Sequence, residues 1–424
     1  MSSTGKIVEV LFENAIDTYE HQERMIDKVD HVQPDAADMQ NAGDVIWRSV
    51  QQHAPIISGW DLTGSEQDII EETYPSILGT PKNDLVQQRA DDLRDTQFWE
   101  RRGKQSGLQQ ATELNKSITS AMVTQGAMHY RSNATSGYDF IAEGQALMNE
   151  RQGAQTQRCF MLNDRDSLKF GKDLAGRQTV QGRPEDVWTM GQIAGNVAEF
   201  DVYTGSFLTN LAGGADPATT VTANQSFKPE GGTVNTTTGV ATNVDYRIAT
   251  IPVAASASYN IGDKVTFANG GTTVKAVGLA DKTDTGQAMT FTIVAKPDGT
   301  SVSIYPKPIA LDDPALSVTE AQYANINTRI LNTATMNRVN IDASAKANLF
   351  WDKDAVEVIG GTIPAQLFKQ FDGMQVISSR MKNGQEMYMV YDGNLATMNF
   401  RYRLFCWYGI TVRDPQRVGI ATTF

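Results

Sequence analysis

The stretch Met289-Thr290-Phe291-Thr292-Ile293-Val294 predicts a short β-strand, because β-branched and aromatic residues dominate it. The turn Pro297-Asp298-Gly299 follows it, and Ser301–Tyr305 predicts the next strand. Further strands are predicted upstream at Arg247–Val253 and Asp263–Phe267, with a turn at Asn269-Gly270-Gly271. Short strands at such spacing are typical of a small β-barrel or sandwich.

These strands lie in a segment, Thr219–Asp312, whose composition differs from the rest of the chain. It is rich in Gly, Thr and Val, contains no His, Cys or Trp, and carries seven acidic and seven basic residues. All six Trp residues lie outside it, as do the helix-length apolar patterns. We therefore predict an all-β domain inserted into a larger α+β host. Nothing in the insert favours chemistry, which points to a surface for contact. Within it, Gly231–Asp245 has no apolar face and is expected to be an exposed, mobile loop.

The host begins with a predicted amphipathic helix at 6–26. Apolar residues recur every three or four positions, and Glu9, Glu13, Asp17 and Glu20 lie on the opposite side. Two interpretations stay open: the helix docks on its own domain, or it is an arm that docks on another chain.

A longer helical pattern starts near Asp95 and runs to about His129. Such a helix would be roughly 50 Å long, which is more than a small compact domain needs. Gly103 and Gly107 are candidate breaks in its first turns. Between the two helices, short apolar runs broken by Gly and Pro at 44–80 predict a hairpin or a long looped excursion.

The rest of the host gives shorter signals. We predict a helix at 138–150, a buried strand at Cys159–Leu162, and irregular Gly-rich structure at 178–218. Further strands are predicted at Ala355–Ile359, Gln375–Ser379, Met387–Tyr391 and Tyr402–Val412. The pattern at Tyr323–Val339 does not decide between helix and strand.

Length and composition indicate a globular chain of 424 residues, long enough for two or three domains. No apolar run approaches the roughly 20 residues of a membrane helix, and the start of the chain does not resemble a secretory signal. The two distant cysteines, Cys159 and Cys406, indicate folding in a reducing compartment.

The net charge of −12 is concentrated at one end, because residues 1–100 hold 20 acidic and 7 basic residues. This acidic region favours a basic partner, or it simply keeps the chain soluble. It argues against a protein that grips nucleic acid, which needs a basic stripe.

The sequence contains no pattern that indicates catalysis. It has no Walker loop, nucleotide-binding glycine motif, nucleophile elbow or Cys-x-x-Cys pair. The four histidines lack metal-ligand spacing, and Asp91, Asp92 and Asp95 fit the start of a helix better than a metal site. We therefore predict no catalytic residue, no metal and no cofactor.

Several strings of this sequence resemble, in order, the coat protein of short-tailed enterobacterial phages. They are Gly59-Trp60-Asp61-Leu62-Thr63, Arg89-Ala90-Asp91-Asp92-Leu93-Arg94-Asp95, Gln225-Ser226-Phe227-Lys228-Pro229, Pro306-Lys307-Pro308-Ile309-Ala310-Leu311-Asp312-Asp313, Tyr323-Ala324-Asn325-Ile326-Asn327-Thr328 and Trp407-Tyr408-Gly409. The resemblance covers essentially the whole chain and is weakest in 131–218 and 231–243.

The resemblance implies an α+β tailed-phage (Hong Kong 97-like) capsid fold with an inserted all-β barrel. The expected parts are an N-terminal arm, an extended β-loop, a long spine helix and an axial domain. Their expected bounds are 1–33 for the arm, 34–150 for a peripheral domain with the extended loop at 44–84 and the spine helix at 95–130, 151–218 for the first axial part, 219–340 for the inserted barrel, and 341–424 for a second axial and peripheral part.

The resemblance also implies a structural role. Such a protein assembles with copies of itself, as hexamers and pentamers, into an icosahedral procapsid and then a mature head around double-stranded DNA. It binds that DNA without sequence specificity and involves no membrane. The implied partners are a scaffolding protein and a portal protein, and the implied location is the virion, after assembly in the host bacterial cytoplasm.

Candidate contact residues follow from the same resemblance. In relatives an acid on the first helix contacts the scaffold, and the matching position is Glu13, with Asp17 one turn on. Asp245 and Arg247 flank the loop that reaches a neighbouring capsomer in relatives, although a local strand-end pair is the alternative.

Candidates for contacts within a capsomer are Trp60, Asp61, Arg101 and Arg102. For the arginine pair, a solvated face or a partner for nearby acids is the alternative. Two other functions compete with a shell protein: a carbohydrate-binding adhesin, weakened by the missing export signal, and a hydrolase with scattered carboxylates, weakened by the missing motif.

Overall fold

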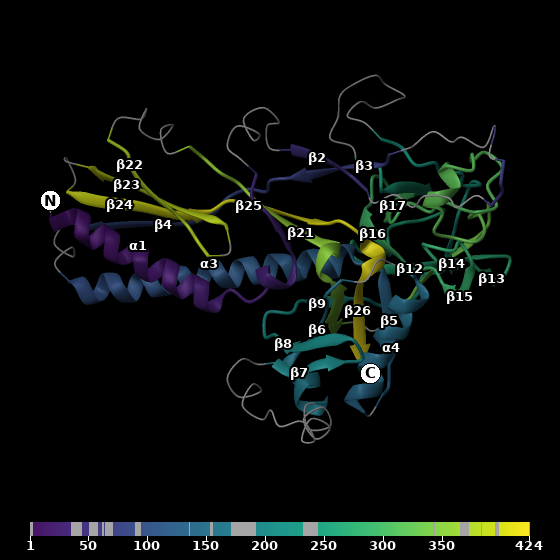
Figure 1. Cartoon of the computed structure of the whole chain (residues 1–424), viewed down its shortest axis with the longest axis horizontal. Helices are drawn as coiled ribbons and strands as arrows, with labels where there is room; N and C mark the ends of the chain where they lie inside the picture. Colours follow the sequence, from purple (N-terminus) through teal and green to yellow (C-terminus); the bar gives the residue numbers. More distant parts are fainter. Residues whose placement is uncertain are drawn as a thin grey trace. The chain divides into compact units, whose positions relative to one another are not determined.

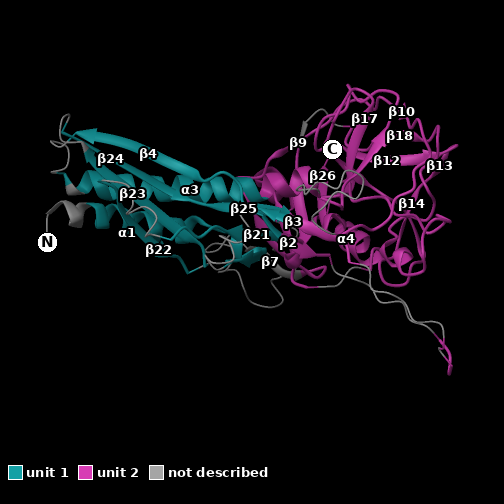
Figure 2. Ribbon diagram, turned by 90° about the horizontal axis from the view of Figure 1, so that it is seen from above, with its two compact units in different colours: residues 1–46, 76–118, 357–411 teal, residues 47–75, 119–356, 412–424 magenta. Residues whose placement is uncertain are grey.

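The computed structural model describes residues 3–34, 45–50, 58–61, 63, 71–89, 95–134, 136–152, 156–170, 192–231, 245–341, 344–364, 373–382, 384–394 and 398–423. The chain divides into two compact units, coloured separately in Figure 2. Unit 1 comprises 1–46, 76–118 and 357–411, and unit 2 comprises 47–75, 119–356 and 412–424. Each unit is therefore assembled from segments far apart in the sequence.

The α-helices described from end to end are α1 (Ser3–Gln22), α3 (Thr96–Gln125) and α4 (Gly137–Glu150). Short 3-10 helices are η1 (Ile26–Lys28), η3 (Glu320–Tyr323), η4 (Lys353–Ala355) and η5 (Pro415–Arg417). Helices α1 and α4 confirm the predictions at 6–26 and 138–150 to within a few residues.

In unit 1, α1 and the first part of α3 lie side by side along one sheet (Figure 1). The strand order of that sheet is β22 (Gln375–Arg380), β23 (Glu386–Asn394), β24 (Asn399–Cys406) and β4 (Lys82–Arg89). On α3, the Trp99 ring meets the rings of Phe400 and Tyr402 of β24 edge-on, at 6.1 and 6.0 Å between centroids. Aromatic packing therefore holds the helix on the sheet.

The two helices of unit 1 approach each other through glycines. A Cβ atom added to Gly107 would overlap the carbonyl oxygen of Ala15, and one added to Gly103 would lie 2.5 Å from the carbonyl oxygen of Leu11. The prediction that these glycines break the long helix is wrong, because α3 is continuous across both. They serve close backbone packing instead.

A second sheet has the order β1 (Asp30–Val32), β21 (Val356–Gly360), β25 (Tyr408–Val412), and β2 (Val45–Ser49) pairs with β3 (Thr73–Ile77). The single strand predicted at Tyr402–Val412 is thus two strands, β24 and β25, in different sheets. The break falls at Trp407, whose indole Nε1 donates to the carbonyl oxygen of Gly79 at 2.7 Å.

In unit 2, a six-stranded sheet has the order β5 (Met128–Ser132), β26 (Val418–Thr423), β20 (Asn348–Asp352), β6 (Arg158–Leu162), β8 (Phe200–Thr204) and β7 (Gln192–Val197). A second pair is β9 (Asn210–Ala212) with β19 (Ser344–Lys346). Phe140 of α4 packs on Phe160 of β6, with ring centroids 5.9 Å apart, in a core rich in phenylalanine.

Two predictions in this region need correction. The long helix ends at Gln125 and not near residue 130, because His129 belongs to β5. The segment 178–218, predicted to be irregular, contains β7, β8 and β9 where it is described. Its glycines masked the short strand signals.

The insert forms a sheet with the order β10 (Thr219–Thr220), β18 (Thr335–Arg338), β12 (Lys264–Asn269), β16 (Phe291–Ala295), β17 (Ser301–Tyr305) and β11 (Ala249–Pro252). In addition, β13 (Thr272–Thr273) pairs with β12, and β14 (Lys275–Val277) pairs with β15 (Asp284–Ala288). The two edge strands meet through the bridge Val221–Val253 and the bond from the Ala254 amide to the Thr220 carbonyl at 2.8 Å. The path of strands therefore closes on itself.

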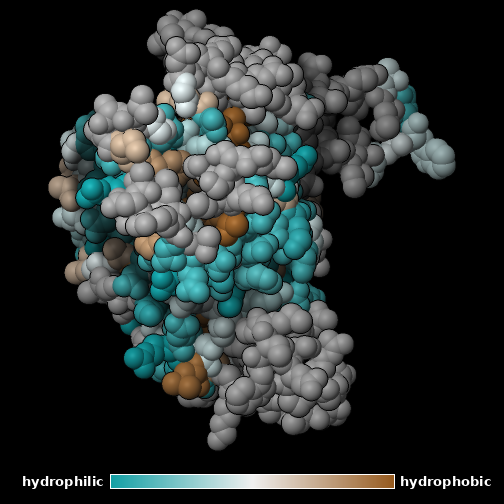
Figure 3. All heavy atoms as spheres, turned by 90° about the vertical axis from the view of Figure 1, so that its left-hand side faces the viewer, coloured by the Kyte–Doolittle hydropathy of each residue, from teal (hydrophilic) through white to brown (hydrophobic). Residues whose placement is uncertain are grey.

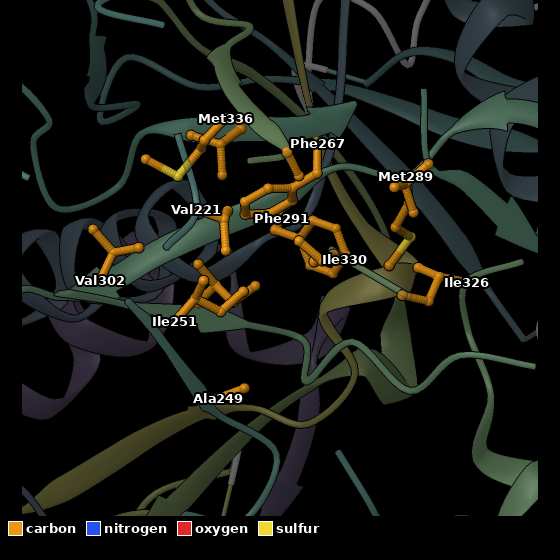
Figure 4. Close-up of a cluster of buried hydrophobic side chains, with 14 of the residues drawn as sticks. Val221, Ala249, Ile251, Phe267, Met289, Phe291, Val302, Ile326, Ile330 and Met336 are labelled. Atoms are coloured by element: carbon orange, nitrogen blue, oxygen red, sulfur yellow. The ribbon is translucent and has the colours of Figure 1, made fainter. Parts of the chain in front are cut away.

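Figure 4 shows the core that this closed sheet surrounds. Phe267 and Phe291 meet edge to face at its centre, 5.6 Å between centroids, and Met336, Ile330 and Met289 fill the space around them. The undecided segment Tyr323–Val339 is also settled: it ends η3 and then enters strand β18.

The insert belongs to unit 2 together with 119–218, so the domain bounds 219 and 340 remain a prediction. Of the predicted loop Gly231–Asp245, residues 232–244 lie outside the described residues. The same holds for 51–57, 62 and 64–70 of the extended loop. Within the described ranges, no helix combines the length and the apolarity that crossing a membrane requires.

Candidate functional site

The first candidate surface is the exposed side of α1, which carries Glu13 and Asp17. The opposite side of the helix is buried against unit 1 through Val8, Leu11, Phe12, Ala15 and Tyr19. This amphipathic pattern places the carboxylates in solvent, as the sequence predicts. It also shows that α1 docks on its own unit, which is one of the two interpretations left open by the sequence.

Next to Asp17, the surface of unit 1 has a pocket of about 250 Å³ lined by Asp17, Glu20, His21, Glu23, Asp27 and Lys382. Four carboxylates thus face one lysine. The backbone amide of Lys382 donates to Glu20 Oε1 at 2.9 Å and is the main cause that lowers the pKa of Glu20, with its ammonium 2.9 Å from Oε2. Glu20 therefore stays charged, and this face of unit 1 is acidic.

Trp60 and Asp61 lie on the extended loop. The Trp60 side chain is fully exposed, at 108% of its reference area, which is unusual for so large an aromatic residue. Asp61 is exposed but locally engaged, since its Oδ1 accepts from the Thr63 amide at 3.0 Å and from the Thr63 hydroxyl at 2.6 Å. These bonds lower the pKa of Asp61. Trp60 is thus the available contact, and Asp61 shapes the turn that carries it.

Arg101 and Arg102 have different environments on α3. Arg101 is exposed, and its Nε donates to the Gln97 carbonyl oxygen of the same helix at 3.3 Å. Arg102 is half-buried, with Nη2 bound to both carboxylate oxygens of Asp84 at 2.7 and 2.8 Å and Nε bound to the Tyr402 hydroxyl at 3.1 Å. Arg102 therefore fits the alternative of a partner for a nearby acid, and Arg101 remains the candidate for contact.

Asp245 and Arg247 bind each other. The guanidinium of Arg247 donates to both carboxylate oxygens of Asp245, from Nε at 2.9 Å and from Nη2 at 2.7 Å. Arg247 is 6% exposed, and its Nη1 donates to the carbonyl oxygens of Val412 and Arg413 at 2.9 Å each. The structure thus shows the local pair that the sequence left open as the alternative to a contact between capsomers.

A buried ion pair beside Arg247 was not predicted from the sequence. Glu72 and Lys307 are each 7% exposed, and Lys307 Nζ lies 3.7 Å from Glu72 Oε1. Burial raises the pKa of Glu72 to about 7, although Lys307 and Arg247 act in the opposite direction. No local signal could have found this pair, because the two residues are far apart in sequence and the string that contains Lys307 carries no information about its partner.

The described residues do not bring together the ligands of a metal site. Within the part of the chain that the structure describes, no cluster of three or more His, Cys, Asp or Glu could hold a metal ion. Asp91 and Asp92 lie outside that part. Cys406 is buried, and burial raises the pKa of its thiol to about 12, which keeps it protonated and unreactive.

Figure 3 shows one face of the molecule by hydropathy. The described residues on that face are mostly hydrophilic, and the hydrophobic ones form small separate spots.

The chain matches known proteins along nearly its whole length. A family model described as P22 coat protein, gene protein 5, matches residues 1–423. Among solved structures, it is similar to a structure described as Mycobacterium phage Che8, with 10% identity, a TM-score of 0.43, and coverage of 94% of this chain and 90% of that one.

Two further structures are similarly distant. The capsid of cyanophage P-SCSP1u has 7% identity and a TM-score of 0.42, covering 94% of this chain and 86% of its own. The head of Helicobacter pylori bacteriophage KHP40 has 7% identity and a TM-score of 0.41, covering 93% and 87%. These likenesses are too distant to carry an assignment, which rests on the family model. Because that model spans residues 1–423, the chain belongs to the P22 coat protein family.

Proposed function

We propose that this structural major capsid protein of the virion closes its shell through many weak contacts made by exposed segments on a firmly bonded framework. The observation that carries this proposal is the match to the coat protein family over residues 1–423. The geometry supports it, because Trp60, Arg101, Glu13 and Asp17 are exposed while Arg102 and Arg247 are engaged inside the chain.

The physical reason for weak contacts is error correction. A closed lattice of many identical subunits jams if each contact is irreversible, and a large number of reversible contacts still gives a stable shell. Exposed ion pairs contribute only about 0–1 kcal/mol each, so their effect comes from repetition over all copies.

The proposed scaffold contact is the acidic face of α1, with Glu13 and Asp17 as its exposed carboxylates. A basic segment of a scaffolding protein would complement this face and the neighbouring acidic pocket. Such an attraction weakens as salt is added, because the Debye length shortens to about 10 Å at 0.1 M ionic strength. Its reversibility suits a helper that leaves the shell after assembly.

Charge reversal at Glu13 and Asp17 tests this contact. We expect E13K and D17K to raise the scaffold concentration needed for half-maximal assembly, with a larger effect at low salt. E143K, which reverses an exposed charge on α4, is the matched control and should behave as wild type. Unchanged assembly by E13K and D17K at every salt concentration would rule the contact out.

The proposed contact within a capsomer is the exposed Trp60 ring. Buried aromatic residues dominate interface energies, with truncation costs of about 2 kcal/mol or more at the strongest positions. We therefore expect W60A to lower the yield of closed shells, and a normal yield would remove Trp60 from the interface. Arg101 is proposed as a charged contact at the rim, where charges contribute less.

Further parts of the proposal concern the contents of the shell. We propose that the shell encloses double-stranded DNA without reading its sequence, since the acidic region 1–100 does not attract phosphates. A portal protein is proposed as a partner because a closed shell needs an opening for its genome.

We also propose that the chain works without catalysis. The adhesin alternative finds no support in the family assignment.

A further inference from the structure

We propose that Arg247 is a positioning residue at a junction that ties the base of the extended loop to both ends of the insert loop, so that the bases of the two loops are held together. The base of the extended loop is Glu71–Tyr74, and the insert loop is 231–245. This inference deepens the proposed function, and its consequence for the shell rests on that function. The link itself stands on contacts within unit 2.

The first end of the link is the Arg247 guanidinium, where four parts of the chain meet. It lies 4.2 Å from the centre of the Tyr74 ring, at the base of the extended loop, and 5.1 Å from the centre of the Tyr305 ring, at the end of β17. It also holds Asp245, where the insert loop ends, and the carbonyl oxygens of Val412 and Arg413. One buried cation thus joins segments separated by up to several hundred positions.

The second end of the link is the beginning of the insert loop. Lys307 Nζ donates to the carbonyl oxygen of Lys228 at 3.0 Å and lies 3.7 Å from Glu72. Gly231 packs so closely on the Glu71 carbonyl oxygen that a Cβ atom there would overlap it. The Lys307 amide in turn donates to the Arg247 carbonyl oxygen at 2.7 Å. Both ends of the insert loop are therefore fixed at the base of the extended loop.

The chemistry of arginine explains why this residue occupies the junction. A guanidinium offers five donors in a planar fork, so it can bind a carboxylate with two bonds, serve two carbonyl oxygens and stack on aromatic rings at once. A lysine ammonium carries the same charge but cannot satisfy these partners together. Substitution by lysine should therefore loosen the junction without removing its charge.

The consequence concerns how movement spreads between contact segments. If both loops touch neighbouring subunits, a shift of the extended loop also shifts the exit direction of the insert loop. Contacts within a capsomer and contacts between capsomers would then adjust together. The link itself can be tested on the unassembled subunit, where neither kind of contact exists.

The experiment is hydrogen–deuterium exchange of the unassembled full-length chain, comparing R247K with wild type. We expect about tenfold faster exchange at 71–77, at 45–50 and at 245–248 together, because these segments share the guanidinium of Arg247 as an anchor. Val50 reports the extended-loop base directly, since its amide donates to the Glu72 carbonyl oxygen at 2.8 Å.

Arg338 provides a matched control in the same insert. It is also 6% exposed, its Nη2 lies 2.7 Å from Asp263 Oδ2, and its guanidinium lies 5.1 Å from the Tyr259 ring. R338K should speed exchange near 213–216 and 258–263 and leave 71–77 unchanged. Should R247K not fold, D245N weakens the same junction more gently and carries the same expectation.

The outcomes separate the link from the proposed function. Faster exchange confined to 245–247, or equal effects of R247K and R338K on 71–77, would overturn the link whatever the assembly behaviour. Faster exchange at both loop bases with normal shell assembly would keep the link and contradict the contact role of the loops.

Discussion

At the scale of single residues, space decides the role of Gly107. A glycine inside a helix such as α3 lowers the stability of the helix by about 1 kcal/mol relative to alanine. The cost is offset because the missing side chain lets α1 pack directly on α3 at Ala15. The relevant information is the position of another helix, which the local sequence of α3 does not contain.

We expect G107A to destabilise the chain by about 1–3 kcal/mol, because the added methyl group meets a backbone carbonyl that cannot turn away. The midpoint of urea unfolding measures this change. G144A in α4 is the control, since its nearest neighbour is the Tyr130 hydroxyl oxygen at 3.3 Å, in a side chain. A G107A chain as stable as the wild type would contradict the packing described for α1 and α3.

Glu72 is a second position where burial decides the behaviour of one residue. Its pKa is raised by burial from 4.5 to about 7, while Lys307, Arg247, Asp245 and Glu230 are the charged groups around it. A carboxyl whose pKa is higher in the folded chain contributes stability that is complete below about 4.5. That contribution is lost as the pH rises through about 7.

We therefore expect the wild-type chain to lose stability between pH 5 and pH 8, by up to about 3 kcal/mol from this one group. E72Q cannot ionise and should show a shallower loss, measured by urea unfolding at both pH values and constant ionic strength. E71Q, at the exposed neighbouring carboxyl, should keep the wild-type slope. An unchanged slope in E72Q would show that Glu72 does not titrate in this range.

At the scale of elements, periodicity predicted what is local. The apolar spacing at 6–26 predicted α1, and the strand signal at Ser301–Tyr305 after the turn Pro297-Asp298-Gly299 predicted β17 with its observed bounds. Alternation in Tyr402–Val412 predicted one strand, but the structure has two strands there, β24 and β25, which belong to different sheets. Alternation tells which side chains share a face, but it does not tell which partner strand lies alongside.

The insert is the part of the chain that we expect to depend least on the rest for folding. Its strands close into one sheet around a core of their own, although Lys264 also donates to the carbonyl oxygens of Val123 and Gly126 at the end of α3, at 2.8 and 2.6 Å. That bond links the insert to the host without supplying the core. The bounds 219–340 include all strands of the closed sheet.

We expect a fragment of residues 219–340 to fold by itself, because it contains both the core and the hydrogen bonds that close the sheet. Dispersed amide signals and a cooperative thermal transition would show this. A fragment of 251–340, which lacks β10 and half of β11, should stay unfolded. Collapsed, undispersed spectra from the longer fragment would mean that the host supplies part of the core.

At the scale of the whole molecule, the sequence predicted the role better than it predicted the contacts. Composition indicated an insert without His, Cys or Trp and an acidic N-terminal region, and the family resemblance indicated the capsid role. The junction at Arg247 stayed hidden, since Tyr74, Tyr305 and Val412 come from three distant segments. Contacts of that kind follow from the fold and leave no pattern along the chain.

A coat protein of this family functions by assembling with copies of itself into a closed shell. Electron microscopy of the purified full-length chain mixed with its scaffolding protein tests it most directly. We expect closed polyhedral particles of regular size, built from hexamers and pentamers. A folded subunit that forms no closed particles under any ratio of scaffold to coat protein would contradict it.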